Sequence, residues 1–323
     1  MSSDMEMTAT DGTSKTASPE TEALPQKKSP AKLMGLALLF VALVLLFTIF
    51  KLPQARITSL LQGYVQIALD PYGIYLTDRG RELSTLHGFR YTLDHPTLEF
   101  ADQTRVELDD LVVTPNFFPL LSGKMGVNAT LHQGPASIIL EGSGRGDKID
   151  MKLDLDHVDI GKFGILSYLA SLKGSGTING NAQVAGTLSD LTSLTGGADL
   201  KVKNLKLDEQ NLMGFQLPPL QISDGTININ IQSGKLVIKT FQLGKGADDL
   251  ILTLTGDVQL NRNLNASILN LKTNFGLSDK VKQSLALLDS ILGPAKTVDG
   301  KYAYKLTGSL GAPFPIPDTV STK

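Results

Sequence analysis

The chain contains no cysteine and no tryptophan among its 323 residues. The lack of cysteine excludes a disulfide framework, a thiol nucleophile and a cysteine-ligated metal, and it suits an oxidising compartment where a free thiol is a liability. Histidine occurs at four positions, and no two of these have the spacing of a metal-binding or metalloprotease motif. The formal net charge is only −2, so nothing suggests a nucleic-acid partner.

Motifs for catalysis or nucleotide binding are also missing. Segment 142–147 holds three glycines but lacks the Lys-Ser/Thr pair and the helix of a phosphate loop, so we predict a hairpin turn there. Segment 174–180 misses the dinucleotide fingerprint by one residue and precedes a predicted strand. No G-x-S-x-G occurs, and the carboxylates are scattered over positions expected to face solvent. We therefore expect no enzyme and no cofactor.

One acidic stretch resembles a metal site at first sight, since it contains Asp154, Asp156, His157 and Asp159. In a regular strand, however, the first two residues face one side and the last two face the other. They could converge only if the strand changes phase between them. A solvated strand face is the favoured interpretation, and we expect no metal.

The chain does have one long apolar run, the eighteen uncharged residues 33–50, with Lys27, Lys28 and Lys32 before it and Lys51 and Arg56 after it. Such a helix is about 27 Å long, close to the roughly 30 Å hydrocarbon core of a bilayer. We predict a transmembrane helix over 32–52. A cleaved signal peptide fits less well, because the run is long and no small-residue cleavage site follows. A buried core helix is the remaining alternative.

The flanking charges suggest the orientation of this anchor. Three lysines precede it and two cations follow it, so the positive-inside rule favours a cytoplasmic amino terminus. We expect a disordered cytoplasmic tail over 1–31, a β-rich domain outside the cytoplasm over 53–317, and a flexible carboxyl terminus over 318–323.

Most of the chain after the anchor alternates between apolar and polar residues. The alternation is clearest in segments 178–188, 226–231, 250–260 and 302–310, and weaker in segments 91–93, 98–100, 105–108, 125–131, 137–140 and 151–155. Because side chains of a strand alternate between faces, each segment should have one apolar and one wet face. This favours a long antiparallel meander over a parallel α/β core.

Interruptions of the alternation predict that the sheet is irregular and curved. The apolar residues change phase between Val202 and Leu205, and again between Leu155 and Val158, as a β-bulge would require. Glycines within the predicted strands allow bends. They stand at positions 180, 186, 256 and 308.

Two helices are expected to interrupt the meander. Segment 278–293 places apolar residues at helical spacing, with Ser278 as the N-cap and Gly293-Pro294 as the stop. Its apolar stripe would pack on the sheet or plug one end of it, and the alternative is a partner-binding helix. Segment 163–172 is the second, shorter helix.

Segment 107–127 resembles the repeating unit of the AsmA and TamB-like envelope proteins, in which a strand leads through a turn and a Leu-Leu-x-Gly-Lys step to a further strand. Segments 174–191 and 306–313 are similar to other strands of that group. The single anchor, the compact length and the closing Thr-Gly-Ser-Leu-x-x-Pro phrase are most similar to the type II secretion system protein N family. That family has no catalytic residues.

The expected fold class is mainly β: one N-terminal transmembrane helix, then a long, curved, AsmA/TamB-like antiparallel meander with one or two short packing helices. The resemblance implies a non-enzymatic periplasmic accessory component of the type II protein secretion system in the inner membrane of a Gram-negative cell. Its partners would be the inner membrane and other secretion-system components. The alternative function is AsmA-like binding or transfer of lipid in envelope biogenesis, with phospholipid as the ligand.

The lipid alternative requires an apolar groove, and one set of alternating residues could line it. These residues are Leu250, Leu252, Leu254, Val258, Leu260, Val281, Leu285 and Leu288. The competing interpretation is that the same residues form an ordinary closed core between the sheet and the helix over 278–293.

Overall fold

The computed structural model describes most of the chain after residue 72. The described residues are 73–84, 89–100, 105–116, 118–170, 172–212, 215–284 and 292–318, together with positions 40, 58, 59, 62, 63, 65, 66, 69 and 70. The predicted tail over 1–31, the anchor apart from Phe40, and residues 319–323 lie outside this set. No helix within the set is long and apolar enough to cross a membrane. The strands all belong to the unit Pro53–Lys323.

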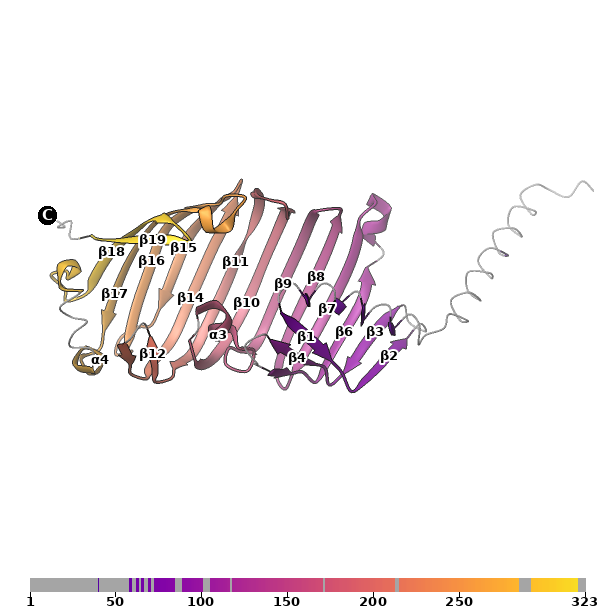
Figure 1. The fold of residues 1–323 in the computed structure, drawn as a ribbon, viewed down its shortest axis with the longest axis horizontal. Coiled ribbons are helices and arrows are strands. Elements are labelled where there is room, and N and C mark those ends of the chain that lie inside the picture. Colours follow the sequence, from indigo (N-terminus) through magenta and orange to yellow (C-terminus); the bar gives the residue numbers. More distant parts are fainter. Residues whose placement is uncertain are drawn as a thin grey trace, which may run out of the picture. The chain divides into compact units, whose positions relative to one another are not determined.

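One antiparallel sheet of fourteen strands dominates the fold, and its strand order follows the chain from β2 at one edge to β19 at the other (Figure 1). Its strands are β2 (Gly80–Ser84), β3 (Arg90–Asp94), β6 (Asp110–Asn116), β7 (Met125–Gln133), β8 (Ala136–Arg145), β9 (Lys148–Asp159), β10 (Gly174–Thr187), β11 (Asp190–Leu207), β14 (Leu220–Gln232), β15 (Lys235–Leu243), β16 (Leu250–Gln259), β17 (Ile268–Leu277), β18 (Tyr302–Ser309) and β19 (Ala312–Pro317). The predicted antiparallel meander is confirmed.

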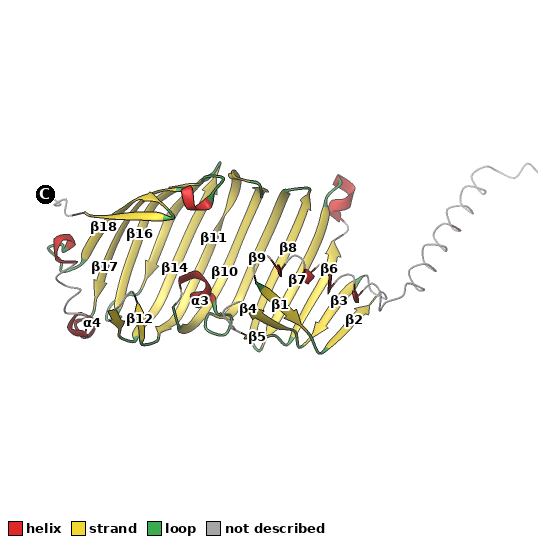
Figure 2. Ribbon diagram, in the orientation of Figure 1, coloured by secondary structure: helices red, strands yellow, loops and turns green. Residues whose placement is uncertain are grey.

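Small elements connect or cover these strands (Figure 2). A three-stranded sheet is formed by β1 (Ile74–Thr77), β4 (Thr97–Phe100) and β5 (Arg105–Glu107), and a hairpin by β12 (Gln210–Leu212) and β13 (Phe215–Leu217). The helices are η2 (Phe118–Ser122), α3 (Ile165–Ala170), η3 (Leu264–Ala266), α4 (Asp279–Ser284) and η4 (Gly293–Ala295).

Every segment predicted to be a strand overlaps an observed strand. Seven strands were not among the predictions, namely β1, β2, β12, β13, β15, β17 and β19, although β17 alternates clearly through Leu269 and Leu271. The sequence therefore identifies the class of the fold and most of its strands.

The two faces of the sheet differ in chemistry, most clearly across β9, β10, β11 and β14. Strand pairing aligns one continuous row of residues across all fourteen strands. That row is Leu83, Tyr91, Val113, Ala129, Leu140, Leu153, Ala182, Ala198, Ile229, Ile238, Gly256, Leu271, Leu306 and Pro315. The adjacent row on the opposite face includes Asp154, Asn181, Asp199 and Asn228. The sheet thus has an apolar face and a polar face, as the alternation predicts.

The two predicted phase changes coincide with β-bulges. His157 in β9 and Asn204 in β11 have positive φ angles of 52° and 51°, and the register of the paired strands shifts beside each of them. Each bulge inserts one extra residue and so returns the following apolar residues to the same face. The four strand glycines singled out by the sequence, at positions 180, 186, 256 and 308, all have φ angles in the left-handed range.

Three apolar clusters hold the small elements against the apolar face. The first joins Ile160, α3, α4 and β13 to strands β10, β11 and β14 to β17, and the second lies among β11 and β14 to β18. The third joins β1 and β4 to β2, β3 and β6. The apolar face is therefore covered in patches, and the central residues Leu140, Leu153 and Ala182 remain half-buried.

The predicted helices form over part of their ranges. The Ser278 Oγ accepts a hydrogen bond from the Val281 N–H at 3.4 Å, which confirms the N-cap, and α4 then runs to Ser284. Residues 285–291 lie outside the described set. The predicted stop is confirmed, because Leu292 is helical and Gly293 and Pro294 begin the short η4 turn instead of continuing the α-helix. The helix over 163–172 is α3.

Prolines occupy the outer edge of the last strand. The Asp318 N–H donates to the Ala303 carbonyl at 2.9 Å, so the backbone at this position points toward β18. Since successive residues point alternately toward and away from the partner strand, Pro313, Pro315 and Pro317 direct their backbone away from the sheet. Proline has no N–H group, so this edge cannot donate hydrogen bonds to another strand.

Candidate functional site

A large apolar cavity lies on the apolar face between β2 and β9, and we call it the β2–β9 groove. Its volume is about 720 Å³, within the usual range of small-molecule sites of roughly 300–1,000 Å³. It is lined by Val65, Leu83, Phe89, Tyr91, Val113, Pro115, Met125, Gly126, Val127, Leu140, Gly142, Ser143, Gly144, Ile149 and Met151. No lining residue carries a charge, so the groove suits an apolar ligand.

Glycine explains why the sheet is hollow at this point. Gly142 and Gly144 place no side chain over β8, while Leu140 and Met151 stand beside them. In addition, α3 and α4 pack on other strands in the apolar clusters, and the helical residue Val65 forms one wall of the groove. Side chains thus form the walls of the groove and backbone forms much of its floor.

The polar face of the same strands has a contrasting character. A smaller hollow of about 120 Å³ lies there, and its lining includes Asn128, Glu141, Asp150 and Lys152. Glu141 and Lys152 are cross-strand neighbours between β8 and β9. The apolar character of the groove is therefore confined to one face of these strands, since their other face carries charged and polar side chains.

Tyr91 supplies an unusual polar group to the groove wall. Its side chain is only 6% exposed, and its hydroxyl has no hydrogen-bond partner within the described part of the chain. Burial raises the pKa of Tyr91, and nearby Arg81 opposes this effect. Arg81 itself is paired with Asp78, with 2.7 Å between Nε and Oδ2. An uncompensated buried hydroxyl destabilises the fold, so we expect its removal to be favourable.

The variant Tyr91→Phe should raise the free energy of unfolding by about 1 kcal/mol, because it removes a buried polar group that has no partner. Its stability should also decline less than that of the parent protein as the pH rises above the ordinary tyrosine pKa of 10.0, since burial favours the protonated phenol in the folded state. Chemical denaturation at pH 8 to 11 measures both effects. Tyr75→Phe, at a position 57% exposed, is the control and should change neither; a destabilised Tyr91→Phe would contradict the expectation.

The residues that the sequence suggested as a groove lining lie elsewhere, on and around strand β16 and helix α4. Leu250 and Val281 belong to the first apolar cluster, and Leu254, Val258 and Leu260 to the second. Leu252 is half-buried, whereas Leu285 and Leu288 lie outside the described residues. Five of the six described members are thus divided between two packed clusters, and Leu252 belongs to neither.

The β2–β9 groove was not identified from the sequence, although a signal for it exists. In segment 138–144, Ile138, Leu140, Gly142 and Gly144 share one face of strand β8. The first two have large apolar side chains and the last two have none. Such a change predicts a local hollow, but only if nothing covers it.

The acidic stretch around His157 does change phase, and the bulge lies at His157 itself. Its Nδ1 is 2.6 Å from the Asp156 Oδ1, and both side chains are about two-thirds exposed. Its backbone N–H donates to the Asn179 Oδ1 at 2.8 Å. Over the described ranges, no three His, Asp or Glu side chains are grouped so that they could hold a metal ion.

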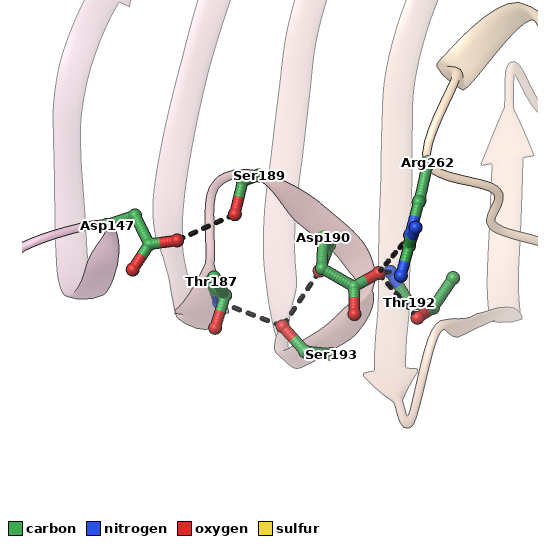
Figure 3. A network of polar contacts seen from close by, with 7 residues as sticks. All are labelled: Asp147, Thr187, Ser189, Asp190, Thr192, Ser193 and Arg262. Atoms are coloured by element: carbon green, nitrogen blue, oxygen red, sulfur yellow. Dashed lines mark hydrogen bonds and ion pairs between the residues drawn. The ribbon is translucent and has the colours of Figure 1, made fainter.

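A polar network joins neighbouring turns at one end of the strands (Figure 3). The Ser189 hydroxyl donates to Asp147 at 2.6 Å, and Arg262 lies 3.9 Å from Asp190. The hydrogen bond from the Thr192 hydroxyl is the main cause that lowers the pKa of Asp190. These groups link the β8–β9, β10–β11 and β16–β17 connections. Their evident role is to order the turns at this end of the strands.

Comparisons with models of protein families, with curated proteins and with solved structures give no match to this chain.

Proposed function

We propose that this protein is a non-enzymatic, membrane-anchored component of a Gram-negative cell envelope that assists type II protein secretion. The observation that carries the proposal is the continuous sheet with one apolar and one polar face, built hairpin after hairpin. The unit over 107–127, which resembles AsmA and TamB-like proteins, corresponds to β6, η2 and β7, and segment 306–313 to the β18–β19 hairpin. In this proposal residues 32–52 form the anchor, and the sheet lies in the periplasm beside other secretion components.

Deletion of the gene tests the secretion proposal. We expect the exported enzymes to disappear from the medium and accumulate in the periplasm, while the lipid composition of the outer membrane stays normal. Expression of the full-length chain should restore secretion. Unchanged secretion in the deletion strain would contradict this function.

The anchor can be tested separately by replacing residues 1–52 with a cleavable signal peptide. We expect secretion to fall, because the released domain would no longer be held at the inner membrane. Full secretion by the released domain would show that the tether is dispensable.

A second candidate function is binding of phospholipid acyl chains, and the β2–β9 groove is the observation that favours it. Its uncharged lining and its volume of about 720 Å³ suit a flexible apolar chain. An apolar ligand would also cover residues of the groove wall that are now partly exposed, such as Met125 and Val127.

Mass spectrometry of the unit Pro53–Lys323, prepared without detergent, tests this second function. Co-purified phospholipid would support it, and a lipid-free protein that retains its β-structure would count against it. Gly142→Leu provides a steric test, because a Cβ at this position meets only ordinary contacts, the nearest being the Val127 Cγ1 at 3.6 Å. We expect the larger side chain to fill the groove and remove the lipid without straining the backbone.

A further inference from the structure

The connection between β6 and β7 presents large apolar side chains to solvent. Phe118 and Leu121 in η2 are 84% and 90% exposed, and Met125 at the start of β7 is 80% exposed. We call these three residues the η2 corner. Apolar side chains this exposed and this close in the chain are a marker of an interaction surface.

The η2 corner is an ordered structure. The Asn116 side chain accepts a hydrogen bond from the Phe118 N–H at 3.1 Å, and the Ser122 hydroxyl donates to the Pro119 carbonyl at 2.8 Å. The Lys124 N–H also donates to Pro119, at 3.0 Å. The turn therefore closes on itself and directs its apolar side chains outward.

Three cations lie near the η2 corner, whereas the carboxylates of Glu141 and Asp150 lie on its other side, in the polar-face hollow that Pro119 also lines. Lys124 lies two residues after η2, and Arg145 and Lys148 are paired across the neighbouring β8–β9 turn. The Arg145 Nη1 lies 3.7 Å from the place that a Cβ on Gly123 would take. None of the three cations forms an ion pair with another described residue. The one acidic residue of the turn, Asp147, accepts a hydrogen bond from the Ser189 hydroxyl.

The same end of the strands carries further exposed leucines in its other turns. Leu188 lies beside the β8–β9 turn, since its N–H donates to the Asp147 carbonyl at 2.9 Å, and it is 59% exposed. Leu264 and Leu310, in the β16–β17 and β18–β19 connections, are 51% and 42% exposed. The opposite ends of the strands instead carry α3 and α4 (Figure 2).

We propose that the η2 corner docks on the surface of a bilayer that contains anionic phospholipid. Phe118 and Leu121 would enter the boundary between headgroups and acyl chains, and the three unpaired cations would contact lipid phosphates. A protein partner would need matching carboxylates and a pocket for two large side chains, whereas a bilayer offers both an apolar layer and negative charge along any edge. Met125 also lines the β2–β9 groove, so docking would bring one end of the groove to the bilayer. The proposal holds whether or not the groove carries lipid.

Environment-sensitive labels test this proposal in the full-length chain, which has no cysteine and so accepts single labels cleanly. Phe118→Cys and Leu121→Cys would each be labelled with a nitrobenzoxadiazole dye. The protein would be reconstituted in phosphatidylcholine vesicles in which phosphatidylglycerol makes up about a third of the lipid. We expect a blue-shifted emission and protection from iodide at both positions. Val298→Cys, at a fully exposed apolar position in another turn, is the matched control and should stay accessible to iodide.

A charge variant tests the role of the cations. Lys124→Gln, Arg145→Gln and Lys148→Gln together should raise the phosphatidylglycerol content needed for half of the blue shift by on the order of tenfold. If the triple variant fails to fold, Lys124→Gln alone, in an exposed turn, replaces it. We expect a smaller change in the same direction. Brominated lipid quenches a dye that contacts it. Placing this lipid either in the vesicles that hold the protein or in separately added vesicles therefore shows which membrane the η2 corner contacts. An iodide-accessible dye at both positions in both arrangements, or an equal blue shift at position 298, would overturn the proposal.

Discussion

Leu140→Glu should reduce the phospholipid bound to the unit Pro53–Lys323 by at least about tenfold, because it places a carboxylate on the wall of an otherwise uncharged groove. Burying an unpaired charge beside an acyl chain costs several kcal/mol, and about 1.4 kcal/mol already corresponds to a factor of ten in affinity. Leu140 is half-buried and lies in the continuous apolar row, so the substitution acts on the groove and leaves the strand pairing intact. Mass spectrometry of the purified protein measures the bound lipid.

The matched control is Ile139→Glu, on the neighbouring residue of the same strand. Ile139 points to the polar face and is 38% exposed, so the same charge remains in water. We expect normal lipid content and a normal circular dichroism spectrum. Equal loss of lipid in both variants would indicate a general effect of charge on β8, and normal lipid in Leu140→Glu would place the ligand elsewhere.

Gly196→Ala should lower the free energy of unfolding by about 3 kcal/mol, the largest stability effect we expect from a single methyl group. Gly196 lies in β11 with a φ angle of 145°, which side chains disfavour. A Cβ there would stand 2.0 Å from the Gln183 carbonyl oxygen, and that oxygen belongs to the neighbouring strand and cannot move without disturbing the ladder. Strand β11 also lies near the middle of the sheet, so strain there affects pairing on both sides.

Gly276→Ala in β17 is the control, because a Cβ there meets only the flexible Lys301 side chain, at 3.4 Å. We expect its stability to remain within about 1 kcal/mol of the parent protein. Urea denaturation followed by far-ultraviolet circular dichroism is the appropriate measurement, since the chain has no tryptophan to report by fluorescence. Equal stability of the two variants would mean that the close approach at Gly196 is relieved by a backbone shift.

Local patterns account for the parts of the fold that the sequence predicts well. Alternation over 178–188 depends only on neighbouring residues, and β10 occupies nearly the same range. The phase changes before Val158 and Leu205 predict bulges for the same reason, because one inserted residue is visible in the local period.

The position of the groove could not be predicted in this way, because it depends on contacts between distant segments. Val281 is fully buried against residues such as Val202 and Leu220, so the apolar row near β16 is covered there. The equally apolar row through Leu140 lies away from α3 and α4, and only Val65 among the described helical residues lines the groove there. The sequence shows which residues face the apolar side, whereas only the tertiary structure shows which of them remain accessible.

The agreement between strand order and chain order has a consequence for synthesis. Each hairpin pairs with the strand made just before it, so the sheet can grow in step with the emerging polypeptide and needs few contacts between distant parts of the chain. During this growth the newest strand always exposes backbone donors that a second nascent chain could capture. Strand β19 forms one edge of the sheet, and its outward positions are Pro313, Pro315 and Pro317, so pairing of β19 with β18 leaves no backbone donor on this edge for a second chain to capture.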